Sequence, residues 1–483
     1  MSTLSRRRLL GAVSSSMGAR LGTAALNYGL FWCLSRRLGT EALGGFSLLM
    51  NMFLMLQTLP LLGLAIPLWR RAATTPRHLP REVSNAFAFG LPVALLIGAG
   101  VGVFGQASYG VPMHLPFWLM AASLLPTAWT IVAESSLLGM ERVSDVARVN
   151  FLESLARSGL TLAAVWLGWG LVGVFAVFLL LRCAAALGYL VHPSMPRPST
   201  RLLSMTMQRR NLAEVPVFLS IAVVTAAASR LDLIVLAHLR GLHDVATYSA
   251  ASRLYDATLI IPTVTALVLL PTLARQFESA REQFRVTLEI AVRVSLGLGL
   301  GVALGVAAVA QPIIDLLYRP EIGSAAPVLR WLIFGSVLML VDTILSSTML
   351  AAKAQAQDLR SLVVAFAVLV PGLLSLPVGF GPAGAAAAVV LALTVRVMWR
   401  LRWAARALEL RPWLGIVRLA ASALAGVAGM LAGLQVSPLA ALAGGLLAYA
   451  AAVLATGVFG RRPWRGLRSE LARLGGRPVP AEH

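Results

Sequence analysis

The sequence predicts an all-α, polytopic membrane protein with about 14 transmembrane helices, and three observations support this fold class. Of the 483 residues, 58% are hydrophobic and only 13% are charged, whereas about a quarter of the residues in soluble domains are charged. The mean hydropathy is +0.80. The apolar residues also gather in runs of about 20, the length that a helix needs to cross the hydrocarbon core of a bilayer. Together these features exclude an ordinary soluble domain.

Fourteen runs are apolar and long enough to be transmembrane spans. The fifth run is polar and the sixth and eleventh are short, so twelve or thirteen spans are the alternatives. The approximate limits are residues 9–35, 43–69, 83–104, 115–138, 146–168, 171–191, 213–239, 245–272, 288–311, 327–350, 360–379, 383–405, 413–434 and 438–459.

The basic residues are distributed unevenly between the connectors of the predicted spans. The chain has 41 Lys and Arg against 20 Asp and Glu, a net charge of +21, which in a soluble protein would suggest a nucleic-acid partner. Here long apolar runs separate the charges. With a cytoplasmic N-terminus, 30 of the 41 basic residues fall in inner connectors and only four in outer connectors, as the positive-inside rule expects. We therefore predict cytoplasmic termini, contact with membrane lipids and no nucleic-acid partner.

Matching residues recur about 200 positions apart, which predicts a duplicated six-helix unit. An offset of 202 pairs Gly39 with Gly241, Ser47 with Ser249 and Pro60 with Pro262, and an offset of 211 pairs residues 168–173 with 379–384. An even number of spans per copy makes the two lobes parallel, and substrate is then expected at the lobe interface. The expected parts are an N-terminal lobe (1–191), a cytoplasmic linker (192–210), a C-terminal lobe (211–405), two additional helices (406–460) and a basic cytoplasmic tail (461–483). The two prolines are expected to kink the second and eighth spans at matching points.

Three arginines inside the spans are the candidate binding residues. A charge in hydrocarbon costs about 2.5–3.5 kcal/mol even on the lenient insertion scale, so each one needs a reason. Arg20 lies in the first span, Arg230 in the seventh and Arg253 in the eighth. We expect them to form a cationic cavity, and a guanidinium suits phosphate because its fork makes two parallel hydrogen bonds and does not deprotonate.

Three intramembrane aspartates are candidate coupling residues, and two of them have a structural alternative. Asp256 is three residues from Arg253, so the two side chains can instead neutralise each other on one helix face. Asp232 is two residues from Arg230 and faces another direction. Asp342 has no partner within its own helix, so it is either a titrating switch or bonded to a neighbouring helix.

Helix spacing also predicts two ordinary surface pairs. Glu153 and Arg157, and Glu289 and Arg293, are both spaced four residues apart, and pairs at this spacing lie on one helix face.

Signals of an enzyme are missing from the sequence. It contains no HExxH, GxSxG or Walker A motif, and His238 and His243 have no third ligand beside them, so neither a metal, nor a cofactor, nor direct ATP coupling is expected. The outer connectors are short and hold no pair of carboxylates. A membrane enzyme acting on lipid-linked sugars is therefore disfavoured.

Four segments have a sequence pattern that is typical of one family. They are Arg-Leu-Gly-Thr-Glu-Ala-Leu-Gly-Gly-Phe-Ser at 37–47, Arg-Leu-Asp-Leu-Ile-Val-Leu at 230–236, Tyr-Ser-Ala-Ala-Ser-Arg-Leu-Tyr at 248–255 and Leu-Pro-Thr-Leu-Ala-Arg at 270–275. These segments resemble the bacterial polysaccharide and O-antigen flippases of the multidrug/oligosaccharidyl-lipid/polysaccharide (MOP) superfamily. Together with the glycine-rich turns expected at 168–173 and 379–384, the resemblance covers most of residues 9–405.

The resemblance implies a non-enzymatic flippase of the inner membrane. Its substrate would be an undecaprenyl-diphosphate-linked oligosaccharide for O-antigen, capsule or exopolysaccharide, moved by alternating access, with a polysaccharide polymerase and chain-length machinery as partners. Arg253 matches an arginine of the related lipid II flippases, but the aspartate before it is missing. Asn51 replaces a basic residue that the repeat places opposite Arg253, and the resemblance makes Asn51 a fourth candidate binding residue of the cationic cavity. A lipid II flippase is therefore the weaker alternative. A drug or cation antiporter of the same superfamily is the second alternative, although acidic cavity residues would suit its cationic substrates better.

Overall fold

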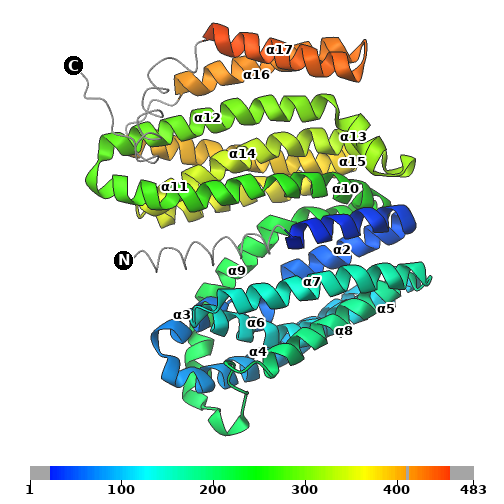
Figure 1. The fold of residues 1–483 in the computed structure, drawn as a ribbon, viewed down its shortest axis with the longest axis vertical. Coiled ribbons are helices and arrows are strands. Elements are labelled where there is room, and N and C mark those ends of the chain that lie inside the picture. The colour runs from blue at the N-terminus through cyan, green and yellow to red at the C-terminus, as the bar shows by residue number, and fades with distance from the viewer. Residues whose placement is uncertain (1–21, 409–412, 457–483) are drawn as a thin grey trace. The chain divides into compact units, whose positions relative to one another are not determined.

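The computed structural model describes residues 22–408 and 413–456, and Figure 1 shows their arrangement. Helices make up all the regular secondary structure in these ranges, which contain no strand. Nine helical stretches within them are long and apolar enough to cross a membrane. The predicted fold class, an all-α polytopic membrane protein, is confirmed, whereas the count of fourteen spans stays a prediction.

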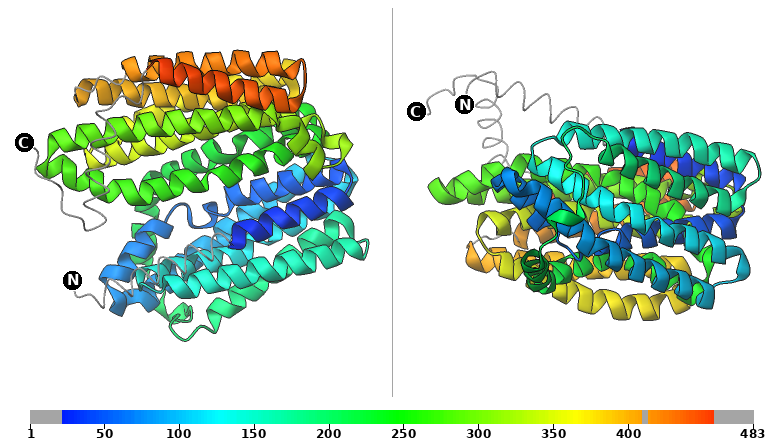
Figure 2. Two further views of the ribbon diagram at one scale, coloured as in Figure 1. Left: turned by 45° about the horizontal axis from the view of Figure 1, so that its top comes forward. Right: turned by 90° about the horizontal axis from the view of Figure 1, so that it is seen from below.

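The chain divides into two compact units, Met1–Ala246 and Thr247–His483, with the boundary inside one helix, α10. The lobe limits predicted from the repeat stay a prediction. Figure 2 gives two more views of the helices.

The first unit begins, within the described residues, with a helix over 22–37. Its further elements are α2 (Thr40–Leu56), η1 (Leu59–Leu61), α3 (Ala65–Thr74), η2 (Pro76–His78), α4 (Leu79–Ser108), α5 (Val111–Ala122), α6 (Leu124–Gly139), α7 (Val143–Trp166), α8 (Gly170–Leu190), η3 (Thr200–Leu202) and α9 (Met205–Arg240).

α10 (Leu242–Thr258) leads into the second unit. The elements that follow are α11 (Ile260–Ser279), α12 (Arg281–Ala308), α13 (Ala310–Leu317), η4 (Pro320–Ile322), α14 (Ala325–Ala351), α15 (Gln355–Ala407), α16 (Trp413–Leu434) and α17 (Pro438–Thr456).

The second and eighth predicted spans are broken rather than merely kinked. Between α2 and α3 the chain passes through η1, which contains Pro60, and then through Leu62 and Gly63, whose φ angles are 48° and 82°. Between α10 and α11 the break falls at Leu259, and Pro262 lies in the first turn of α11. Proline removes a backbone donor and clashes with the preceding turn, so both prolines lie at interruptions, as their matched positions in the repeat predict.

The glycine turns lie where the repeat places them. Gly168 and Gly170, with φ angles of 81° and 57°, form the turn between α7 and α8. Gly381, with φ 57° and ψ −142°, divides α15 into two helical segments. A positive φ costs a glycine little and strains other residues, so these positions explain why the motif is rich in glycine.

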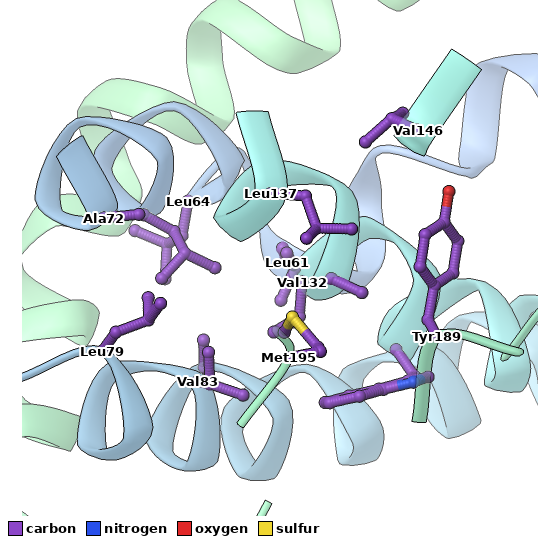
Figure 3. Packing of buried hydrophobic residues seen from close by; sticks show 14 of the residues in the cluster. Leu61, Leu64, Ala72, Leu79, Val83, Val132, Leu137, Val146, Tyr189 and Met195 are labelled. Atoms are coloured by element: carbon purple, nitrogen blue, oxygen red, sulfur yellow. The ribbon is translucent and has the colours of Figure 1, made fainter. Parts of the chain in front are cut away.

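The core of the first unit joins α3, α4, α6 and α8. Buried apolar side chains from these elements pack together with Met195 of the connector after α8 (Figure 3). The Tyr189 ring of α8 belongs to this cluster and is 1% exposed. This packing fixes α8 against α6, which matters for the polar side chains described below.

Close backbone packing joins α2 to the start of α10 within the first unit. A Cβ added at Gly44 would overlap the backbone carbonyl of Leu242, whereas one added at Gly39 would meet nothing within 4 Å. Gly44 therefore allows an approach that a larger side chain would block.

Candidate functional site

The structure brings together two of the predicted binding residues, Asn51 and Arg230. Asn51 lies on α2 and is 3% exposed. Its amide nitrogen donates to the Ser47 carbonyl at 2.8 Å, which fixes the orientation of the side chain. Its Oδ1 then accepts a hydrogen bond of 3.0 Å from the Arg230 guanidinium of α9. Since an amide oxygen is neutral, Asn51 positions this cation without cancelling its charge.

The repeat does not by itself predict this contact. The offset of 202 aligns Asn51 with Arg253 as equivalent positions, whereas Asn51 hydrogen-bonds Arg230, 179 residues away in the sequence. The repeat relates equivalent positions in two copies, whereas the contact depends on how α2 packs against α9 within one unit. No periodic pattern in the sequence carries that information.

The other predicted binding residues are placed in part. Arg253 lies on α10 in the second unit with intermediate exposure. Arg20 lies outside the described residues. Asp232 and Asp256 also have intermediate exposure, and Asp232 Oδ1 accepts a hydrogen bond from the Leu233 backbone N–H at 2.9 Å. The roles assigned to these four residues stay predictions.

Asp342 is bonded to neighbouring helical segments, which is one of the two alternatives left open by the sequence. Its carboxylate lies 2.7 Å from Arg400 and 3.4 Å from Arg396, both in the second segment of α15. Arg400 is fully buried and also lies 2.6 Å from Asp358 in the first segment. It donates further to the Ser361 hydroxyl at 3.0 Å and to the Asp342 carbonyl at 2.8 Å. The Arg400 cluster, as we call these five residues, ties α14 to both segments of α15, while a coupling role for Asp342 stays a prediction.

The first unit holds a second group of charges, partly buried between helices, that the sequence did not reveal. The Arg182 guanidinium of α8 lies 3.4 Å from Glu153 of α7 and packs over the rings of Phe53 and Phe178. Glu134 of α6 lies near Arg182 and Glu153, and its Oε1 accepts a hydrogen bond of 3.4 Å from Tyr189. The sequence signal that could have identified Glu134 is a single acidic residue in a long apolar run, as for Asp342.

The two predicted surface pairs have different outcomes. Arg293 donates to Glu289 at 3.2 Å, as the four-residue spacing predicts. Glu153 instead forms an ion pair with Arg182, and Arg157 donates to Asn27 of the helix over 22–37 at 2.7 Å. α7 packs against α8 and against the helix over 22–37 near these residues. Side chains on those two helices therefore compete with the partner four residues away on α7.

Chemically, the site around Arg230 is suited to bind an anion. A positioned guanidinium makes charge-assisted hydrogen bonds to phosphate oxygens. Across the described ranges, three or more His, Cys, Asp or Glu side chains nowhere gather closely enough to hold a metal ion.

Comparison with known proteins assigns the family. The model of the polysaccharide biosynthesis protein family matches residues 9–277, more than half of the chain, and the MatE family model matches residues 216–373. No curated protein matches the sequence.

Solved structures share the fold at low sequence identity. The lipid II flippase MurJ in an inward closed conformation is 13% identical, with a TM-score of 0.72 over 92% of this chain and 99% of that one. An inward-facing multidrug resistance MATE transporter of the MOP superfamily is 16% identical, with a TM-score of 0.63 over 80% and 94% of the two chains. A Vibrio cholerae MATE transporter is 14% identical, with a TM-score of 0.56 over 82% and 96%. The solved transporters thus share the fold of this chain, a multi-pass membrane protein by its apolar helices, and the chain belongs to the polysaccharide biosynthesis protein family.

Proposed function

We propose that this protein flips an undecaprenyl-diphosphate-linked oligosaccharide repeat unit across the inner membrane by alternating access, for O-antigen, capsule or exopolysaccharide synthesis. The observation that carries the proposal is the contact between Asn51 and Arg230, in a chain whose family is that of polysaccharide biosynthesis proteins. In this proposal Arg230 binds the diphosphate, and Asn51 holds the Arg230 side chain in position.

The charge of the pair supports an anionic substrate. Asn51 is buried and its amide oxygen is neutral, so this hydrogen bond orients the guanidinium of Arg230 and does not itself cancel the charge. A hydrogen bond to a charged group contributes about 1.5–3 kcal/mol. Arg20 and Arg253 are further binding residues in this proposal, and Asp232, Asp256 and Asp342 are candidates for coupling.

The positive-inside pattern supports cytoplasmic termini, since most connector arginines lie on one side of the predicted spans. A substrate made on cytoplasmic lipid and used outside would require a polymerase and chain-length machinery as downstream partners.

Two alternatives follow from the same superfamily. The MatE match and the MATE transporters favour a drug or cation antiporter. The fold that the chain shares with MurJ favours a lipid II flippase. A cationic drug would be repelled by Arg230, whereas a lipid diphosphate would be attracted, so the charge of this residue favours the glycan-lipid substrate.

Deletion of the gene tests the proposal in cells. We expect surface glycan to disappear and the lipid-linked repeat unit to accumulate inside. Arg230→Ala should reproduce the deletion while the protein still inserts, whereas Arg240→Ala should not. Arg240 is the matched control because it ends the same helix and is exposed, in an ion pair with Asp244.

Two results would redirect the assignment. Normal surface glycan with lost drug resistance would favour the antiporter. Arrested cell-wall synthesis with accumulation of lipid II would favour the lipid II flippase. Full glycan output from Arg230→Ala would remove this arginine from the mechanism.

A further inference from the structure

Glu134 lies among polar side chains of three helices in the first unit. α6 carries Glu134, α7 carries Glu153 and Asn150, and α8 carries Arg182 and Tyr189. Arg182 lies 3.4 Å from Glu153, with side chains only 14% and 9% exposed. Tyr189 donates to Glu134 Oε1 at 3.4 Å, while Asn150 faces the same carboxyl group and Arg182 attracts it. Two carboxylates therefore share one guanidinium here.

The Arg400 cluster of the second unit provides an internal comparison. It also contains two carboxylates, Asp342 and Asp358, but two arginines, Arg396 and Arg400, lie against them. Its charges balance when every group is ionised. The corresponding group around Glu134 has one cation for two acids, so one carboxylate is left uncompensated when both are ionised.

Buried and partly buried charged side chains on the other helices packed against α6 are engaged elsewhere, and Arg70 of α3 and Arg81 of α4 are exposed. Arg71 of α3 forms ion pairs with Glu82 of α4 and Glu214 of α9, and Glu82 is also bound by Arg210. His114 of α5 contacts the Tyr109 carbonyl at 2.9 Å.

On α7 itself, Arg157 donates to Asn27. Asp145 lies near Arg142, Arg148 and His192 at the end of the helix. The charged and titratable groups that act on Glu134 are therefore Arg182, Glu153 and Tyr189.

An uncompensated carboxylate inside a membrane protein is stabilised either by a bound cation or by a proton. A metal ion would meet the Arg182 guanidinium, and the described residues offer no set of three acidic, His or Cys ligands. A proton needs no coordination shell. Tyr189 and Asn150 can hydrogen-bond both forms of the acid, since a hydroxyl and an amide each donate and accept.

We propose that Glu134 is a proton-binding site of this transporter and that it takes up and releases one proton in each transport cycle. The proton adds to a carboxylate oxygen and changes the charge of the group formed by Glu134, Glu153 and Arg182 from −1 to zero. Glu134 has intermediate exposure, so it can exchange the proton. The link to transport rests on the proposed function, but the proton site itself does not.

Proton binding is measured directly on the purified full-length protein in detergent by infrared difference spectroscopy between high and low pH. We expect a protonated-carboxyl band in the wild type that is lost in Glu134→Gln and shifted in Glu134→Asp, which keeps the acid. Glu41→Gln is the matched control because Glu41 is an exposed acid of the same unit. A full band in Glu134→Gln would overturn the site, and a band in the wild type that sodium chloride abolishes at constant pH would show that a metal cation binds instead. If Glu134→Gln does not fold, Tyr189→Phe must shift the same band, and an unshifted band overturns the assignment.

Coupling is measured separately in proteoliposomes loaded with lipid-linked oligosaccharide. A pH gradient should stimulate translocation by the wild type and by Glu41→Gln but not by Glu134→Gln. Gradient-stimulated transport by Glu134→Gln would overturn the coupling. Absence of wild-type translocation of this substrate with an intact infrared band would instead refute the proposed function and leave the proton site standing.

Discussion

Replacing Arg400 by methionine should destabilise the second unit strongly. Arg400 is fully buried and connects three helical segments through Asp342 at 2.7 Å, Asp358 at 2.6 Å and the Ser361 hydroxyl at 3.0 Å. Methionine fills part of the space but leaves the buried Asp342 carboxylate with only Arg396, which lies farther away at 3.4 Å.

The magnitude follows from the partners that are lost. Breaking a buried pair by removing one member costs about 3–5 kcal/mol. Because Arg396 stays near Asp342, we take the lower end, about 3 kcal/mol. At roughly 2–4 °C per kcal/mol for a unit of this size, the unfolding midpoint should fall by about 6–12 °C.

Thermal unfolding of the purified protein in detergent measures this change. Arg402→Met is the matched control, since Arg402 lies half a turn further along α15 and is exposed, and surface changes usually stay within about 0.5 kcal/mol. Asp342→Asn combined with Arg400→Met should cost less than the sum of the two single variants, because it removes both charges. A midpoint for Arg400→Met equal to that of Arg402→Met, or strictly additive effects, would refute the reasoning.

Three further predictions concern the first unit. Asn51→Ala should lower substrate flipping about tenfold because Arg230 loses the side chain that orients it, and it should also lower stability by about 1.5–3 kcal/mol, the contribution of a hydrogen bond to a charged group; unchanged initial rates in proteoliposomes would contradict this. Gly44→Val should reduce the yield of folded protein on size-exclusion chromatography because the new side chain overlaps the backbone of Leu242, whereas Gly39→Ala should not. Equal yields of the two variants would show that the helices move apart at this contact at little cost. Glu82→Ala should lower the unfolding midpoint by several degrees because it leaves Arg210 without its carboxylate partner, and Glu82→Asp should restore part of the loss; a midpoint unchanged in Glu82→Ala would show that this ion pair adds no stability.

Sequence reasoning predicted the features that depend on local chemistry. Apolar runs identified the membrane helices, because length and composition alone decide whether a helix can cross a bilayer. The glycines of the two turns were recognisable because a positive φ selects glycine, as at Gly168 and Gly381. Pro60 and Pro262 likewise marked the places where the second and eighth spans are interrupted.

Features that depend on packing between helices could not be predicted. Spacing along α7 paired Glu153 with Arg157, but Glu153 meets Arg182 on α8. The repeat aligns Asn51 with Arg253 as equivalent positions and does not indicate that α2 packs so that Asn51 meets Arg230. Periodicity specifies the face on which a side chain lies and leaves the neighbouring helix undetermined. Buried charges were recognised as costly, while their partners became visible only in the folded chain.

The central claim is that Arg230, held by Asn51, binds the diphosphate of a lipid-linked oligosaccharide during flipping. The most direct measurement is translocation of fluorescent undecaprenyl-diphosphate oligosaccharide by purified protein in proteoliposomes. We predict translocation by the wild type and Arg240→Ala, and loss of at least tenfold in Arg230→Ala, equivalent to about 1.4 kcal/mol or more. Wild-type rates in Arg230→Ala, or no translocation by the wild type, would contradict the claim.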